Sequence, residues 1–374
     1  MILSSTIVFF LIIQIVILVI FFFFSIKQKH NTNKIIANCI QSTQFKDIEV
    51  IVAAKEDKAL LSSCLENVLR CGFTSVKVCL DGSSTEDYEY LKKEFPDVVF
   101  FRNENSQGKI KSQIQCITKS DKEFILILDA DINLFVSEIS GFVSYFKKQK
   151  IDFLCPYSVG RSSRHNSILF FLAEADRLLR QRIVRTGRDF FGVSNLSGYC
   201  LLANRRKYLD VIDGNAIQDD VIATLNLLEK GYTVKTYPKA VCSELERPTI
   251  KTMLFQKTRW TAGNILLLNS YPKLFVKTTF QKAFAFSSSF ILWYWALWVD
   301  MISMIFSMFC PPVTFVLGLE WVLKYLMLNY VSENKKMYFF NLFYIILWPL
   351  FATLCLVMCP FYLRGKINEQ KTRR

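Results

Sequence analysis

The most restrictive feature of this 374-residue sequence is an apolar run from Ile7 to Ile26, interrupted only by Gln14 and Ser25. About 20 apolar residues match the hydrocarbon thickness of a bilayer, and a helix satisfies every backbone hydrogen-bonding group inside it. A cleaved signal peptide is the alternative interpretation, but no Lys or Arg precedes the run and no small-residue cleavage pattern follows it. The run therefore predicts a membrane anchor.

The topology of the membrane segments is set by the charges beside them. Lys27, Lys29 and Lys34 follow the anchor, which places the next segment in the cytosol and the N-terminus outside. Three further apolar segments are found near the C-terminus, at about Phe284 to Phe309, Val313 to Leu328 and Phe339 to Leu363. Three crossings would leave the basic C-terminal tail outside, against the same rule, and the middle segment is short enough to lie at the interface. The number of crossings stays open.

The distribution of charge argues against a nucleic-acid-binding protein, and the spacing of the cysteines argues against disulfide or metal-binding roles for them. A formal charge of +14 could indicate a protein that binds nucleic acid. The basic residues, however, gather beside apolar spans, where anionic lipid headgroups attract them. Membrane lipids are therefore the expected partner and nucleic acid is not. The eleven cysteines include no Cys-x-x-Cys pair, and a cytosolic domain keeps its thiols reduced. We interpret them as small buried apolar side chains.

Between the membrane regions, short apolar runs alternate with amphipathic stretches, which is typical of parallel strands covered by helices. The expected strands are Ile48–Ala53, Val76–Leu80, Val98–Phe101 and Phe124–Leu128. The expected helices between them are Lys58–Cys71, Tyr88–Phe95 and Lys109–Ile117. The pattern predicts an α/β domain of βαβ units, in which ligands bind at the carboxyl ends of the strands.

Polar residues follow all four expected strands, so we expect a single polar cleft there. They are Lys55 and Glu56, then Asp81, then Asn103 to Lys109, and finally Asp129 with Asp131. The two aspartates at the end of the fourth strand offer hard oxygen ligands that suit Mg²⁺ or Mn²⁺. A solvated turn is the alternative for an isolated Asp-x-Asp, but the position after a buried strand favours a metal site.

Two other motifs are weak when taken alone. Gly108 and Lys109 open a helix, where a glycine lets the backbone approach a ligand and a lysine brings positive charge near a phosphate. Asp219 and Asp220 precede an apolar-periodic helix expected over Val221 to Lys230. One acid is explained as a helix cap, and the second is a candidate general base.

A last motif lies near the second membrane region. Gln256, Arg259 and Trp260 share one face of an expected helix. The plain interpretation is an interfacial helix with an aromatic anchor.

In this order the motifs resemble those of glycosyltransferase family 2, in particular its membrane branch of cellulose, chitin and hyaluronan synthases. The resemblance covers most of the chain. The matching elements are Ala54-Lys55-Glu56, Asp81-Gly82-Ser83-Ser84, Gly108-Lys109, Asp129-Ala130-Asp131, Ser197-Gly198-Tyr199, Asp219-Asp220 and Gln256-x-x-Arg259-Trp260. The sequence departs from the family at Leu80, where relatives carry a second acid, and at Gln218, where they often carry Thr, Gly or Glu.

The resemblance implies a GT-A fold, a Rossmann-like nucleotide-sugar-binding domain, and transfer with inversion that gives β linkages. It assigns nucleotide binding to Lys55, Glu56, Asp81, Gly108, Lys109 and Asp129, and the metal, Mg²⁺ or Mn²⁺, to Asp129 and Asp131. It assigns the acceptor and the diphosphate to Ser197, Gly198, Gln256, Arg259 and Trp260. Asp220 is the implied general base, and a UDP-sugar is the favoured donor.

The expected organisation has five parts: an N-terminal anchor (1–30), a cytosolic GT-A domain (45–248), an interfacial segment with Gln-x-x-Arg-Trp (249–282), a C-terminal membrane region (283–364) and a basic tail (365–374). We expect a plasma-membrane enzyme that extends a β-linked polysaccharide on a carbohydrate acceptor. The alternative is a single addition to a membrane lipid, because ceramide glucosyltransferases resemble this chain in length and layout. A non-catalytic scaffold would lack an acid, whereas Asp129, Asp131 and Asp220 are all present.

Overall fold

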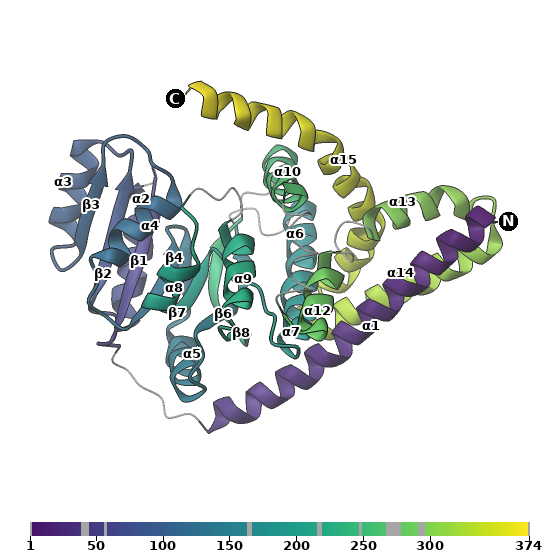
Figure 1. Ribbon diagram of the computed structural model, residues 1–374, viewed down its shortest axis with the longest axis horizontal. Coiled ribbons are helices and arrows are strands. Elements are labelled where there is room, and N and C mark those ends of the chain that lie inside the picture. Colours follow the sequence, from purple (N-terminus) through teal and green to yellow (C-terminus); the bar gives the residue numbers. More distant parts are fainter. Residues whose placement is uncertain are drawn as a thin grey trace. The chain divides into compact units, whose positions relative to one another are not determined.

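The computed structural model describes residues 2–38, 45–55, 58–162, 167–214, 219–246, 249–266, 278–290 and 296–372. The chain forms two compact units (Figure 1). The sheet unit comprises Lys29–Arg161 and Gly192–Leu245. The helical unit comprises Met1–Gln28, Ser162–Phe191 and Glu246–Arg374.

The sheet unit is built on eight strands in the order β3-β2-β1-β4-β7-β6-β8-β5. Their bounds are β1 Ile48–Ala54, β2 Val76–Asp81, β3 Val99–Asn103, β4 Phe124–Asp129, β5 Ile132–Leu134, β6 Phe153–Arg161, β7 Cys200–Asn204 and β8 Val234–Leu245. The first four strands pair in parallel, and β7 runs antiparallel to both β4 and β6. The four predicted strands are confirmed, and their order is that of a Rossmann-like half.

The helices of this unit are α2 Lys58–Arg70, α3 Thr85–Glu94, α4 Lys109–Thr118, α5 Val136–Lys148, α8 Arg205–Val211 and α9 Asp219–Glu229. The three helices predicted between the strands are confirmed. The helix α3 begins three residues before the predicted Tyr88, because the Ser84 side chain accepts a hydrogen bond from the Asp87 amide and caps it. The helix α9 is followed by Gly231, whose φ of 74° closes the helix end as the sequence predicts.

Burial explains why the central strands have continuous apolar sequences. Every residue of β1 except Ala53 is buried, because both faces of the strand are covered. On one side α2 contributes Leu61, Leu65 and Val68, which recur at helical spacing. The cysteines fit this core: nine of the ten described are buried, all ten are free thiols, and Cys310 is half-buried.

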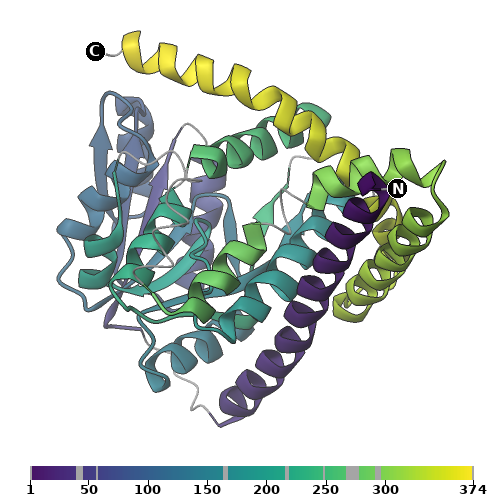
Figure 2. The same cartoon turned by 45° about the vertical axis from the view of Figure 1, so that its right-hand side comes forward.

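The helices of the helical unit are α1 Ile2–Ala37, of which Lys29 onward belongs to the sheet unit, α6 Ile168–Leu178, the π-helix η1 Leu179–Arg185, α7 Thr186–Asp189, α10 Ile250–Leu266, α12 Phe280–Phe290, α13 Ala296–Ser307, α14 Pro311–Val331 and α15 Met337–Thr372. Figure 2 shows α1 in purple and α15 in yellow. Within this unit, Ile7 and Leu11 of α1 pack against Val313 and Leu317 of α14.

Three stretches of the described helices are long and apolar enough to cross a membrane: Leu3–Ala37, Pro311–Val331 and Met337–Arg364. The first contains the predicted anchor. The middle C-terminal segment, expected to be short, is a helix of 21 residues because Pro311 begins it earlier than predicted. The predicted span from Phe284 to Phe309 includes parts of α12 and α13 and residues 291–295, which lie outside the described residues. This membrane span therefore stays a prediction.

Polar residues of α1, α13 and α14 contact one another. Lys324 pairs with Asp300 at 2.8 Å and with Glu320 at 2.6 Å. Gln14, which interrupts the anchor sequence, donates hydrogen bonds to Asp300 at 2.7 Å and to Glu320. Because an unpaired polar group is costly inside a bilayer, these contacts explain how the anchor tolerates Gln14.

Candidate active site

The polar cleft begins at Asp81, the last residue of β2, whose carboxylate organises the loop before α4. Its Oδ1 accepts from the Gln107 amide at 2.8 Å, and its Oδ2 accepts from the Gly108 amide at 2.9 Å and the Ser106 hydroxyl at 2.7 Å. Burial alone would raise the pKa of Asp81, but these hydrogen bonds and one from Asn103 outweigh burial and lower the pKa to about 2. Asp81 therefore stays ionised and holds the loop that presents Gly108 and Lys109.

The first residue of α4, Lys109, links two of the predicted elements. Gly108 precedes it with a φ of 95°, a conformation that favours glycine. The Lys109 ammonium forms an ion pair with Asp129 at the end of β4 and donates a 2.8 Å hydrogen bond to the carbonyl of Gly198. The Asp129 amide in turn donates to the carbonyl of Tyr199 at 3.0 Å. The metal motif and the Ser197-Gly198-Tyr199 loop are therefore joined directly.

The second predicted metal ligand, Asp131, lies in an environment rich in negative charge. Burial, together with the neighbouring carboxylates of Asp129 and Glu244, raises its pKa to about 6. Glu244 comes from β8 and accepts a hydrogen bond from the Ser158 hydroxyl. A divalent cation bound here would offset the negative charge that raises the pKa of Asp131.

The third part of the cleft is a small cavity that contains both the acceptor-loop residues and the candidate base. It is lined by Gln113, Ile127, Leu196, Ser197, Gly198, Leu201, Tyr208, Ile212, Asp220 and Ala223. Asp220 lies in the first turn of α9, where the helix dipole favours a carboxylate. The hydroxyl of Thr224 ties that turn to the loop, because it donates to the Asp220 carbonyl at 2.6 Å and accepts from the Leu196 amide at 3.0 Å.

The remaining predicted site residues lie apart from these contacts. Lys55 follows β1 and is exposed, and Glu56 lies outside the described residues. Gln256, Arg259 and Trp260 lie on α10, which belongs to the helical unit, and Gln256 is exposed whereas Arg259 and Trp260 are half-buried. The roles assigned to these five residues stay predictions.

The model of the family described as glycosyltransferase like family 2 matches residues 46–263, more than half of the chain. The chain belongs to this family. It is therefore an enzyme of the glycosyltransferase class. The match runs from the residue pair before β1 to α10, so it includes the metal aspartates, Asp220 and the Gln-x-x-Arg-Trp motif.

Two curated relatives of this glycosyltransferase are poly-β-1,6-N-acetyl-D-glucosamine synthases. The protein of Staphylococcus aureus (strain COL) is 24% identical over 232 residues, which are 60% of this chain and 56% of that protein. The protein of Staphylococcus epidermidis is 24% identical over 262 residues, which are 67% of this chain and 63% of that protein. The chain thus spans less than two thirds of the length of the curated relatives it matches.

Among solved structures, a mannosyltransferase from Pyrobaculum calidifontis in complex with GDP-Man and Mn²⁺ has a similar fold. The TM-score is 0.58 at 13% sequence identity, and the match covers 94% of this chain and 98% of that one. At this identity the likeness concerns the fold alone, and it agrees with the GT-A architecture of the sheet unit.

Two residues of this glycosyltransferase site were not predicted from the sequence. Arg161, at the end of β6, donates a 2.8 Å hydrogen bond from Nη2 to the carbonyl of Asp131, and Glu244 is the third carboxylate beside the metal motif. Both lie near the ends of strands that the sequence analysis did not identify. A search for polar residues at the end of every apolar run, rather than the first four, would have found them.

Proposed function

We propose that this chain transfers a sugar from a nucleotide sugar, with inversion, to a hydroxyl of a growing β-linked polysaccharide at the plasma membrane. The observation that carries the proposal is the contact made by Lys109, which joins the metal aspartate Asp129 to Gly198. Gly198 lines the same cavity as Asp220. Contacts between neighbouring residues therefore connect the proposed metal ligand Asp129, through Lys109 and Gly198, to the cavity that Asp220 lines.

The candidate metal ligands suit a hard divalent cation, Mg²⁺ or Mn²⁺. Asp129 and Asp131 offer carboxylate oxygens, and no group of three His, Cys, Asp or Glu side chains among the described residues forms a complete metal cage. Mg²⁺ is commonly held by one or two carboxylates together with substrate phosphates. When bound, the metal supplies positive charge that offsets the charge developing on the diphosphate.

In the proposed reaction the carboxylate of Asp220 accepts the proton of the acceptor hydroxyl. The hydroxyl oxygen attacks C1 of the sugar, and the bond from C1 to the diphosphate oxygen breaks in the same displacement, which inverts C1 without a covalent intermediate. Lys109 adds positive charge on the side of the leaving diphosphate. By family resemblance, Arg259 serves the diphosphate and Trp260 serves the acceptor.

The location is inferred from the charges beside the anchor, and the sugar donor is inferred from the curated relatives. Lys27, Lys29 and Lys34 beside the anchor favour a cytosolic sheet unit. The two staphylococcal relatives are named as poly-β-1,6-N-acetyl-D-glucosamine synthases, so UDP-N-acetylglucosamine is the first donor to test.

A second candidate is a single addition to a membrane lipid. It is favoured by the three stretches of the described helices that are long and apolar enough to cross a membrane, because they bring membrane lipids to the chain.

Product size distinguishes the two candidates. Membrane vesicles carrying the chain would be incubated with UDP-N-acetylglucosamine, UDP-glucose or GDP-mannose, with Mg²⁺, with Mn²⁺ or with excess EDTA, and the labelled product would be sized. We expect a polymer from a UDP-sugar and no product in EDTA. A lipid carrying a single sugar would replace the first proposal with the second, and full activity in EDTA would exclude the metal.

The role of Asp220 is tested by Asp220→Asn, a change that keeps the shape of the side chain and removes the base. We expect turnover to fall by about 10² to 10⁴, the usual contribution of general-base catalysis, while the Kd for UDP stays the same. The matched control is Asp213→Asn, an exposed aspartate ahead of α9. A variant that keeps more than about a tenth of wild-type turnover would assign the base to another residue.

A further inference from the structure

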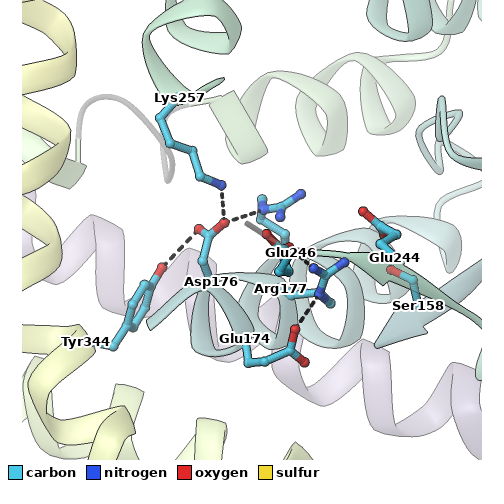
Figure 3. Close-up of polar contacts among 9 residues, drawn as sticks. Ser158, Glu174, Asp176, Arg177, Glu244, Glu246, Lys257 and Tyr344 are labelled. Atoms are coloured by element: carbon cyan, nitrogen blue, oxygen red, sulfur yellow. Dashed lines mark hydrogen bonds and ion pairs between the residues drawn. The ribbon is translucent and has the colours of Figure 1, made fainter. Parts of the chain in front are cut away.

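A fully buried carboxylate, Asp176 on α6, lies at the centre of a polar network in the helical unit (Figure 3). Its Oδ2 accepts from Lys257 of α10 at 2.5 Å and from Arg180 of η1 at 2.9 Å. Its Oδ1 accepts from the Tyr344 hydroxyl of α15 at 3.3 Å. One side chain therefore ties together three separate segments of the unit.

The two cations that Asp176 holds are also the two that pack against Trp260. The Lys257 ammonium lies 4.1 Å from the centre of the Trp260 ring, and the Arg180 guanidinium lies 4.9 Å from it. Cations attract the face of an indole at these distances. Since both bind the same carboxylate oxygen, Asp176 determines where they stand and, through them, where the indole stands.

The network is complete in itself. Arg177, next to Asp176, pairs with Glu174 at 2.8 Å and with Glu246. Three cations, Arg177, Arg180 and Lys257, thus meet three carboxylates, so no anionic ligand is needed for balance. Burial alone would raise the pKa of Asp176, but Arg180 and Lys257 outweigh it and lower the pKa, which keeps the carboxylate ionised.

The segment that carries Asp176 is itself fixed. A Cβ on Gly187 would lie 2.4 Å from the Phe21 carbonyl oxygen, so only glycine allows α7 this close to α1. Arg182 of η1 donates to the carbonyl of Val331 at 2.8 Å. Short π-helical turns of this kind often occur at functional sites. The residues that follow Asp176 are therefore held against α1 and the end of α14.

We propose that Asp176 is a positioning residue that fixes Trp260 through Lys257 and Arg180 and thereby sets how tightly the enzyme holds its acceptor. The proposal rests on the proposed function, which gives Trp260 the acceptor. It explains why a fully buried acid occurs near the C-terminal end of α6, and why Lys257 occupies an unspecified position of the Gln-x-x-Arg-Trp motif.

The first test is spectroscopic and needs no activity. Full-length protein is purified in detergent, and the emission of Trp260 is isolated by subtracting the spectrum of the same protein carrying Trp260→Phe. We expect Asp176→Asn to shift the Trp260 emission to longer wavelength, because the indole loses its fixed neighbours and meets water. Glu333→Gln, which breaks an ion pair of the same π-helix, is the control and should leave the emission unchanged. Unchanged emission in Asp176→Asn would overturn the proposal.

The second test separates positioning from folding. Asp176→Asn leaves a buried ammonium on Lys257, so the double variant Asp176→Asn/Lys257→Met is made to remove that charge. UDP-N-acetylglucosamine and a β-linked N-acetylglucosamine oligosaccharide are the probes. We expect both variants to raise the KM for the oligosaccharide at least about tenfold, as misplaced contacts do. We expect their KM for the nucleotide sugar to stay within about twofold of wild type.

The outcomes are distinguishable. A double variant that regains both wild-type Trp260 emission and the wild-type oligosaccharide KM would make the network purely structural and overturn the proposal. A wild-type protein that transfers nothing to the oligosaccharide would instead overturn the proposed polysaccharide function, and the emission comparison alone would then decide the role of Asp176.

Discussion

The proposed metal site of the sheet unit and the buried network of the helical unit use the same kinds of side chain in opposite surroundings. The Lys109 and Asp129 side chains are 37% and 33% exposed. Those of Lys257 and Asp176 are 8% and 0% exposed. Asp131 beside Asp129 has a pKa raised to about 6, whereas the pKa of Asp176 is lowered.

The difference separates charged groups that can exchange their partners from charged groups that cannot. A partly exposed pair such as Lys109 and Asp129 contributes little stability and can exchange its partners for phosphate and metal at small cost. A buried pair such as Lys257 and Asp176 cannot lose a partner without leaving a charge in a low-dielectric interior. We therefore expect changes in the first region to affect activity and changes in the second to affect stability and position.

The largest expected effect is that of Asp129→Asn. We expect turnover to fall by at least about a thousandfold, because the metal contributes several kcal/mol to charge stabilisation in the transition state. The free energy of unfolding should change by less than about 1 kcal/mol, as for other exposed pairs. Turnover assays and chemical unfolding in detergent measure the two effects. A variant that is strongly destabilised but keeps its activity would mean that the Lys109–Asp129 pair is structural and not part of the active site.

In the helical unit, Asp176→Ala should lower the free energy of unfolding by about 3–5 kcal/mol, because the buried ammonium of Lys257 loses its partner. The same unfolding experiment measures it. The matched control is Glu333→Ala, whose side chain is 76% exposed and should matter little. Equal effects of the two changes would mean that burial does not distinguish these ion pairs.

Asp81 tests whether burial or the choice of unit decides the effect on stability, because it is a buried acid inside the sheet unit. Its folded pKa of about 2 lies below the usual value of an aspartate. A lowered folded pKa stabilises the protein above the unfolded pKa, and the contribution is lost as the pH falls from about 4 to about 2. Asp81→Asn should cost about 2 kcal/mol at pH 7 and progressively less in acid.

Unfolding of wild type and Asp81→Asn between pH 3 and pH 7 checks this expectation, with Asp97→Asn as the control on an exposed aspartate. A stability difference that does not depend on pH would mean that the Asp81 carboxyl has the same pKa in the folded and the unfolded protein.

The smallest effect is expected for the surface pair of Lys147 and Asp47. Their charged atoms lie 2.6 Å apart, but the side chains are 36% and 43% exposed. Asp47→Ala should therefore change the free energy of unfolding by about 0–1 kcal/mol, and added salt should reduce the effect further. A cost as large as that of Asp176→Ala would be incompatible with exposure as the deciding quantity.

Much of the fold could be predicted because its signals are local. The strands Ile48–Ala54 and Phe124–Asp129 are short apolar runs bounded by polar residues, and the anchor is a single apolar run. The segment from Ile168 to Asp189 was not predicted as helical, because its apolar residues are mixed with eight acids and bases, several of which pair with residues far away in the chain.

By itself the sequence determined the elements and the chemical types at their ends: the membrane anchor, the four parallel strands, and the acids that follow β2 and β4. Only the tertiary structure decided how these residues are used. Lys109 meets Gly198 across 89 residues of chain, and Lys257 meets Asp176 across 81. The physical reason is that periodicity and turn chemistry act over a few residues, whereas hydrogen bonds, burial and pKa shifts depend on which distant segments the fold brings within a few ångströms.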